Sequence, residues 1–215
     1  ILMDYMKGGS LSDLIEQETR GLAPSNYDNT KRQIILIGIS RGMMLLHQLH
    51  IIHRDIKPEN ILLDENLHPR ITDFGLSKFF DPHHSMSQSK TDTGTAAYMA
   101  PEVIESDHYN TKADVYAFGI LMVEVLSGKR AYSNFFKSSK KNTIFQLKKK
   151  VCEGFRPDID SNIKKGLRLI IERCLSQNPK KRPSFREIFN KLSLSQVDSI
   201  FEFESNYAEP NVIND

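Results

Sequence analysis

Hydrophobic residues recur at three- and four-residue intervals in the first quarter of the chain. Between residues 26 and 50 this stripe consists of Ile35, Ile39, Gly42, Leu46 and Leu49. A single apolar stripe at this spacing predicts a long amphipathic helix whose stripe faces the core. Residues 113–126 are apolar on nearly every side, which predicts a buried central helix ending at Ser127-Gly128. Two further helices are expected around residues 163–175 and 184–192.

Strand signals are shorter. Ile61-Leu62-Leu63 and Ile71-Thr72 flank a turn region that contains Asn66 and Pro69. Two apolar runs on either side of such a turn predict a short β-hairpin. The sequence therefore predicts a mostly helical α+β domain with one short hairpin.

The two ends of the chain have their own patterns. Residues 1–6 are typical of a strand, and the Lys7-Gly8-Gly9 turn leads from it into a helix that Ser10 or Ser12 caps. Residues 193–215 contain acidic side chains but no Lys or Arg. This composition predicts a weakly ordered tail after a domain that covers residues 1–192.

Composition narrows the class of protein. With 215 residues the chain is long enough for one domain with a sizeable core, and its net charge of +2 gives no reason to expect a nucleic-acid partner. No apolar run approaches the roughly 20 residues of a membrane span. Cys152 and Cys174 form no metal-ligand pattern, so reduced thiols and a cytoplasmic location are expected.

Two short runs contain residues suited to phosphoryl transfer, namely His53-Arg54-Asp55-Ile56-Lys57-Pro58-Glu59-Asn60 and Asp73-Phe74-Gly75. Moving a phosphoryl group onto a hydroxyl requires a carboxylate that accepts the hydroxyl proton, hard oxygen ligands for Mg²⁺ and a cation on the migrating phosphate. We assign these roles, in that order, to Asp55, to Asn60 with Asp73, and to Lys57.

These two runs resemble the catalytic loop and the metal-binding motif of protein kinases. Residues 94–102, Gly-Thr-Ala-Ala-Tyr-Met-Ala-Pro-Glu, resemble the kinase substrate-docking turn and its terminal Ala-Pro-Glu. The resemblance covers residues 1–192 and implies the C-terminal lobe of the kinase fold, with ATP and Mg²⁺ as cofactors and a protein substrate. Lys57 is similar to the lysine of serine/threonine kinases. The Asp-Val-Tyr-Ala-Phe-Gly run at residue 114 and Arg-Pro-Ser-Phe at residue 182 resemble the tyrosine kinase-like group.

The resemblance also implies a nucleotide site at the hinge. Met3 matches the gatekeeper position, and the carbonyl of Asp4 and the amide of Met6 would bond the adenine edge. Because backbone groups would do this, a strand, turn and helix without a ligand role remains an alternative. Two further assignments stay open. Ser10 and Asp13 either approach the ribose or only cap a helix, and Leu62 either packs beneath the adenine or belongs to the core.

Regulatory roles are expected for the activation segment, residues 75–102. In kinases with this arrangement the residue at the position of Arg54 pairs with a phosphate on that segment, and Lys78 is a second cation that the fold would bring towards it. Thr91 is the preferred phosphosite, Ser89 and Thr93 are the alternatives, and a constitutively ordered loop is the remaining possibility. Thr95 would bond Asp55 and Lys57. The resemblance gives structural roles to His53, Phe74, Glu102, Asp114 and Arg182, with Glu102 paired to Arg182 and Asp114 holding the backbone of the catalytic loop.

The sequence contains no Gly-x-Gly-x-x-Gly phosphate loop, no strand lysine and no partner glutamate helix, which kinases carry before the hinge. We therefore expect that the N-terminal β lobe is missing and that it belongs to the same parent chain. Three hypotheses follow: the large lobe of an active kinase, a pseudokinase, or a truncated decoy. Intact Asp55, Lys57, Asn60 and Asp73 favour the first, although the 215 residues alone are expected to be inactive.

Overall fold

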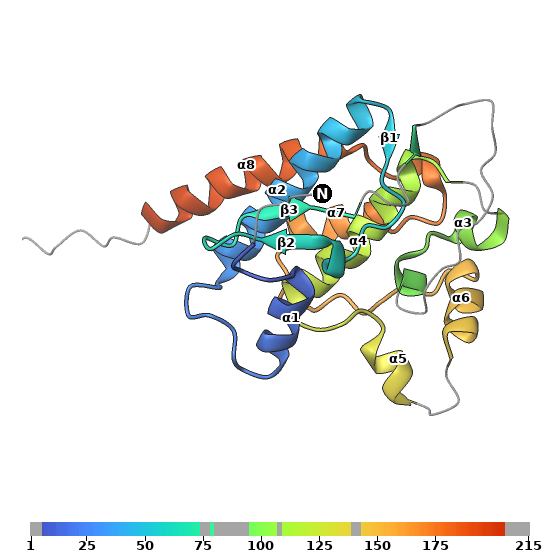
Figure 1. Ribbon diagram of the computed structural model, residues 1–215, viewed down its shortest axis with the longest axis horizontal. Helices are drawn as coiled ribbons and strands as arrows, with labels where there is room; N and C mark the ends of the chain where they lie inside the picture. The colour runs from blue at the N-terminus through green and yellow to red at the C-terminus, as the bar shows by residue number, and fades with distance from the viewer. Residues whose placement is uncertain (1–5, 74–77, 80–94, 107–108, 139–142, 205–215) are drawn as a thin grey trace, which may run out of the picture.

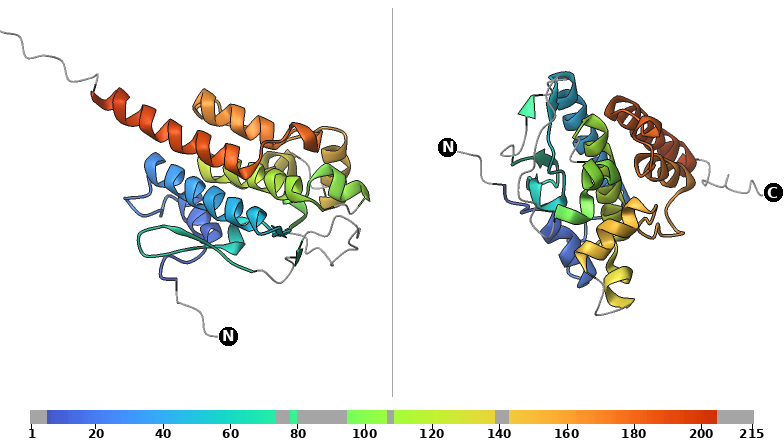
Figure 2. Two further views of the ribbon diagram at one scale, coloured as in Figure 1. Left: turned by 90° about the horizontal axis from the view of Figure 1, so that it is seen from above. Right: turned by 90° about the vertical axis from the view of Figure 1, so that its right-hand side faces the viewer.

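The computed structural model describes residues 6–73, 78–79, 95–106, 109–138 and 143–204, and their helices and strands form three layers. Two helices, α2 (Asn29–Gln48) and α4 (Thr111–Ser127), form the middle layer (Figure 1). The helices α7 (Lys165–Cys174) and α8 (Phe185–Glu204) cover one side, and a hairpin of β2 (Ile61–Leu63) and β3 (Pro69–Ile71) covers the other (Figure 2). The mostly helical fold with a catalytic-loop hairpin is confirmed.

Helix α2 is shorter than its apolar stripe predicts. The helix begins after Asp28, whose side chain accepts a hydrogen bond from the backbone N–H of Lys31, because residues 24–27 form a turn closed by Tyr27 N–H and the Pro24 carbonyl. Ile35 and Ile39 are fully buried, as predicted. The prediction was wrong for Leu49, which is 63% exposed because the helix ends at Gln48 and the stripe loses its register there.

Helix α4 is buried along almost its whole length, as its uniform apolarity predicts. The Asn110 side chain caps its first turn by accepting a hydrogen bond from Lys112 N–H. Gly128 ends it in the left-handed conformation, with φ of +64°, which glycine adopts without strain. The helix packs against both α2 and α7, so it is the centre of the core.

The hairpin lies close against α2 because two helical glycines leave room for it. A Cβ atom at Gly38 would lie 2.6 Å from Cγ of Pro69, and one at Gly42 would lie 2.8 Å from Cδ1 of Ile71. Strand β3 follows Asn66 and pairs antiparallel with β2, with Ile61 opposite Ile71. The glycines therefore set the position of the strand that leads to Asp73.

We expect Gly38→Ala to destabilise the chain by about 1–3 kcal/mol, even though alanine is the better helix former. The added methyl group would overlap the Pro69 ring and push the hairpin away from α2. The matched control is Gly166→Ala in α7, where a Cβ atom meets nothing within 4 Å, so this change should be neutral or slightly stabilising. Urea unfolding of both variants measures the difference, and equal stability would contradict the packing argument.

The remaining elements connect these layers. A second antiparallel pair joins β1 (Ile51–Ile52) to β4 (Lys78–Phe79), on either side of the catalytic segment. The others are helix α1 (Leu11–Thr19), the 3-10 turns η1 (Pro58–Asn60), η3 (Thr95–Tyr98) and η4 (Pro179–Lys181), and the helices α3 (Pro101–Ser106), α5 (Ser133–Ser138) and α6 (Ile144–Cys152).

Helix α8 continues past residue 192 to Glu204, so the first part of the segment expected as a tail is helical. Residues 193–204 contain neither Gly nor Pro, and nothing in this stretch ends the helix. Among the residues that the structure describes, no helix is both long enough and apolar enough to cross a membrane. Both cysteines carry free thiols.

Candidate active site

The catalytic loop lies between β1 and η1, and the Asp114 side chain of α4 binds its backbone. One carboxylate oxygen of Asp114 accepts a hydrogen bond from His53 N–H at 2.9 Å, and the other accepts one from Arg54 N–H at 2.9 Å. His47 of α2 adds a contact of 2.8 Å between its Nε2 and Asp114 Oδ2. These bonds hold Arg54 at a φ of +71°, which is unfavourable for a side-chain-bearing residue without such support.

Asp55 is nearly buried, and only one of its carboxylate oxygens is occupied. Oδ2 accepts a hydrogen bond from Asn60 Nδ2 at 2.9 Å and lies 2.9 Å from Lys57 Nζ. Oδ1 is buried and has no hydrogen-bond partner among the described residues. His53 supports the loop from behind, since its Nδ1 accepts the Asp55 N–H at 3.3 Å while its Nε2 lies 3.0 Å from the Thr72 carbonyl. One oxygen of this carboxylate is therefore a buried acceptor to which none of the described residues donates.

Asn60 and Asp73 are brought together by the hairpin. The Thr72 N–H and hydroxyl both donate to the Asn60 carbonyl, at 2.9 and 3.1 Å, and Asp73 follows directly. The Asn60 side-chain nitrogen donates to the Asp55 carbonyl at 2.8 Å as well as to its carboxylate, which directs the amide oxygen away from Asp55. Asp73 is exposed and has a φ of +60°. One amide and one carboxylate oxygen suit Mg²⁺, which is bound through few protein ligands together with phosphate oxygens.

The turn expected at the nucleotide side pairs with β2. Gly8 N–H donates to the Leu63 carbonyl at 3.0 Å, Leu63 N–H donates to the Gly9 carbonyl at 2.9 Å, and half-buried Leu62 lies opposite Ser10. Half-buried Met6 accepts the Gly9 N–H through its carbonyl at 3.2 Å, and Gly8 leaves no room for a Cβ atom beneath the Asp64 carbonyl. These contacts join the turn that follows Met6 to the strand that contains Leu62, while Asp4 lies outside the described residues.

Ser10 and Asp13 form a capping box at the start of α1. Ser10 Oγ accepts the Asp13 N–H at 3.1 Å, and Asp13 Oδ2 accepts the Ser10 N–H at 3.0 Å and the Ser10 hydroxyl at 2.7 Å. These bonds from the Ser10 hydroxyl and amide lower the pKa of Asp13 below its ordinary value. The capping alternative is thus present in the structure, and contact with a ribose stays a prediction.

The Arg54 guanidinium stacks on Tyr109, with Cζ 4.4 Å from the ring centroid. Its Nε is buried and makes no hydrogen bond to any part of the chain that the structure describes. The phosphosite predictions at Ser89, Thr91 and Thr93, and the role of Phe74, lie outside the described residues. Lys78 and Thr95 are described through their backbone in β4 and η3 only, so their predicted side-chain contacts stay predictions.

A small cavity of about 20 Å³ separates the catalytic loop from the turn at residues 95–100. Asp55 and Arg54 line one side of it, and Tyr98 and Met99 line the other. This volume admits roughly one water molecule, so it is no nucleotide pocket. It shows that η3 lies directly beside Asp55.

The sequence matches the protein kinase domain family over residues 1–192. The chain belongs to the protein kinase family. The RGS domain-containing serine/threonine-protein kinase A of Dictyostelium discoideum is 34% identical over 187 residues, which are 87% of this chain and 15% of that protein. The LRR receptor-like serine/threonine-protein kinase FEI 2 of Arabidopsis thaliana is 35% identical over 210 residues, 89% of this chain and 33% of that protein. The chain thus spans at most about a third of the length of these relatives. The similarity to a plant receptor-like kinase points to the tyrosine kinase-like group, as the motifs predicted.

The kinase domain also contains the expected contact between Glu102 and Arg182. Nη1 and Nη2 of Arg182 donate to the two carboxylate oxygens of Glu102, at 2.6 and 2.8 Å. Residues that the sequence analysis missed include His47, which contacts Asp114, and Tyr109, which stacks on Arg54. Neither side chain has a local sequence signal for its role, because each partner lies on another element.

Proposed function

We propose that this chain is the large lobe of a protein serine/threonine kinase, which transfers the γ-phosphate of ATP to Ser or Thr hydroxyls of protein substrates. The observation that carries the proposal is the buried, unpaired Oδ1 of Asp55, a residue that lines a cavity together with the docking turn. A buried acceptor without a donor is costly, and a substrate hydroxyl would supply the missing hydrogen bond.

The remaining residues then have defined tasks in the reaction. Asp55 Oδ1 accepts the proton of the acceptor hydroxyl, while the bonds from Asn60 and Lys57 to Oδ2 fix the orientation of the carboxylate. Lys57 Nζ lies 2.9 Å from Asp55 Oδ2, so its positive charge lies close to where the phosphate must arrive. Asn60 and Asp73 would hold Mg²⁺. When bound, this ion neutralises charge on the phosphate oxygens.

Two further features support the serine/threonine class. Lys57 is of the serine/threonine type, and the relatives named above are serine/threonine-protein kinases. We further propose that the phosphate loop, the strand lysine and its glutamate partner are supplied by a small lobe in the same parent chain. The turn that follows Met6 and the strand that contains Leu62 would then form part of the nucleotide site.

The test is phosphate transfer by the full-length parent protein with Mg²⁺ and γ-labelled ATP. Four peptides that differ only at the acceptor position, with Ser, Thr, Tyr or Ala, separate the acceptor classes. We expect labelling of the Ser and Thr peptides, none of the Tyr and Ala peptides, and negligible transfer by the 215 residues alone. Labelling of the Tyr peptide alone would refute the serine/threonine class, and no labelling of any peptide or of the protein itself would refute catalysis.

A further inference from the structure

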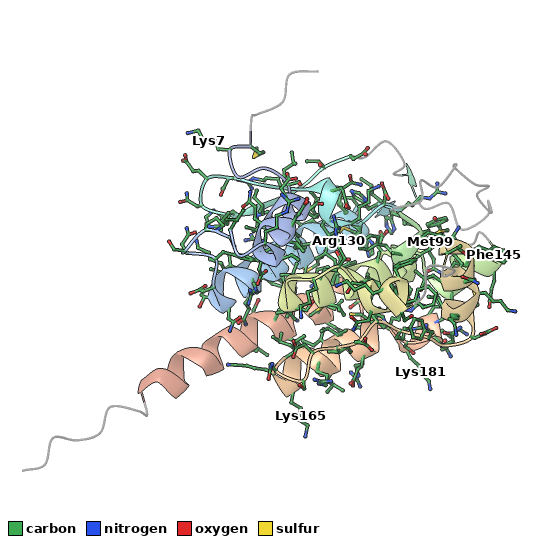
Figure 3. The ribbon with its side chains drawn as sticks, turned by 90° about the horizontal axis from the view of Figure 1, so that it is seen from below. Lys7, Met99, Arg130, Phe145, Lys165 and Lys181 are labelled. Atoms are coloured by element: carbon green, nitrogen blue, oxygen red, sulfur yellow. The ribbon has the colours of Figure 1, made fainter. Side chains whose placement is uncertain are left out.

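Arg130 joins four separate elements next to the catalytic loop. It follows the end of α4, and its guanidinium contacts Glu59 of η1 at 2.9 Å, Ser12 of α1 at 2.5 Å and Tyr98 of η3 at 3.3 Å. It also lies 3.5 Å from the carboxylate of Glu124 in α4. Figure 3 shows Arg130 in the middle of the face seen from below. One side chain therefore bridges the catalytic loop, the docking turn and two helices.

The two carboxylates that face Arg130 differ in their surroundings. Glu124 is 2% exposed, with Oε1 accepting the Ala131 N–H and Oε2 accepting the Tyr98 hydroxyl, both at 2.8 Å. Burial raises the pKa of Glu124, although these two donors and Arg130 act in the opposite direction. Glu59 is much more open, with 45% of its side chain exposed, and its second contact is with the Ser12 hydroxyl at 3.3 Å.

The arrangement is a guanidinium site rather than a general acidic patch. It offers two carboxylates and two hydroxyl oxygens to a planar group with several N–H donors, which suits arginine better than lysine. Burial alone would lower the pKa of Arg130, but Tyr98, Glu124 and Glu59 together raise it. Because 43% of the Arg130 side chain is exposed, the space it fills opens to solvent. Without Arg130, the carboxyl groups of Glu59 and Glu124 would lose their shared guanidinium partner next to that opening.

The position of this site relates it to substrate. Glu59 is the residue before Asn60, whose side chain bonds Asp55 at 2.9 Å. Tyr98 lines the cavity shared by Asp55 and the docking turn. A protein segment that brings a hydroxyl to Asp55 along this turn therefore passes close to Arg130.

We propose that Arg130 is a specificity-determining residue, which fills this guanidinium site from within the chain and so keeps arginine side chains of a protein substrate out of it. The proposal rests on the proposed function, since it concerns which substrates the same site accepts. Two consequences follow. An arginine near the acceptor hydroxyl of a substrate does not raise kcat/KM of the natural protein. The same arginine raises kcat/KM of the variant that lacks Arg130.

The experiment compares the full-length parent protein with its Arg130→Ala variant on pairs of peptides. In each pair, one position near the acceptor serine holds either arginine or citrulline, which has nearly the same shape but no charge. We expect a ratio of kcat/KM near one for the natural protein. For Arg130→Ala we expect the arginine peptide to be favoured about tenfold at one or two positions, through KM, because a charged hydrogen-bonded pair forms. A variant that was merely destabilised would lose activity on both peptides equally.

Matched controls separate charge from site. Arg20→Ala removes the same charge from an exposed pair with Glu16 on α1 and should leave the ratio near one. Glu59→Gln added to Arg130→Ala should abolish the preference. A ratio near one for Arg130→Ala, or an equal rise for Arg20→Ala, would overturn the proposal.

A second measurement keeps the two proposals apart and needs no catalysis. Ethylguanidinium at millimolar concentration should raise the melting temperature of Arg130→Ala above that given by ethylammonium, and should not do so for the natural chain or for Arg20→Ala. If no peptide is phosphorylated but this shift is seen, the guanidinium site stands and the kinase reaction fails. If Arg130→Ala does not fold, Arg130→Gln takes its place. No selective shift in either variant, with no arginine preference, refutes the site.

Discussion

Replacement of Asp55 by Asn is expected to lower kcat of the full-length parent protein by about 10²–10⁴-fold, the range typical for loss of a general base. The asparagine keeps the shape of the side chain and can still accept the bond that Asn60 now gives to Oδ2 at 2.9 Å. It cannot accept a proton, and it no longer offers Lys57 a negative charge at 2.9 Å. Because neither loss concerns the nucleotide side of the molecule, we expect the KM for ATP to change little. Steady-state kinetics at saturating peptide measure both values.

Two matched changes of Asp to Asn show whether the effect belongs to the base. Asp28→Asn alters the cap of α2, where Asn is as good a cap as Asp, and should leave kcat unchanged. Asp73→Asn should instead weaken Mg²⁺-dependent ATP binding, since it removes a carboxylate oxygen from the expected ligand pair. Near-normal transfer by Asp55→Asn would show that another group accepts the proton. Equal kinetic defects in the Asp55 and Asp73 variants would show that the two carboxylates do not have separate roles.

The catalytic loop could be predicted because its residues are contiguous and their chemistry is local to the sequence. Asp55, Lys57 and Asn60 lie within six positions, and the short hairpin that brings Asp73 beside Asn60 has its own turn signal. The burial of Ile35 and Ile39 followed from helical spacing for the same reason. Predictions failed where the ends of a helix decide the outcome. Leu49 has the right spacing for the core but lies just beyond the last turn of α2.

The contacts that assemble the site from different elements could not be predicted. Arg130 and Ser12 are 118 positions apart, and their contact depends on how α1 and the end of α4 pack beside η1. A sequence shows that Arg130 and Glu59 carry opposite charges, but so do many pairs that never meet. The contact of His47 could not be predicted for the same reason, since its partner Asp114 lies on another helix. Such contacts are products of the packed core and become visible only with the fold.

Removal of the Arg182 side chain should have the largest effect on stability, with Arg182→Ala costing about 3–5 kcal/mol. The side chain is fully buried and donates to both oxygens of Glu102, which is 17% exposed. It also donates to the carbonyls of Ser176 and Lys112, both at 2.9 Å, and its guanidinium lies 5.0 Å from the Tyr116 ring centroid. All of these acceptors would lose their partner at once, and the truncation would leave a cavity beside α4.

Glu102→Gln should cost less than Arg182→Ala, because the guanidinium keeps its carbonyl partners and glutamine still accepts one hydrogen bond. The double variant should be less destabilised than the sum of the two single changes, since each removes a partner of the other. Lys7→Ala is the control, because it breaks an exposed ion pair in which Lys7 Nζ lies 3.0 Å from Glu65 Oε2. This substitution should lower the free energy of unfolding by at most about 1 kcal/mol. Urea unfolding of the natural chain, the two single variants and the double variant completes the cycle, and Lys7→Ala is measured beside them. If Arg182→Ala cost no more than Lys7→Ala, the buried pair would not be what fixes the docking turn and α3 to the central helix.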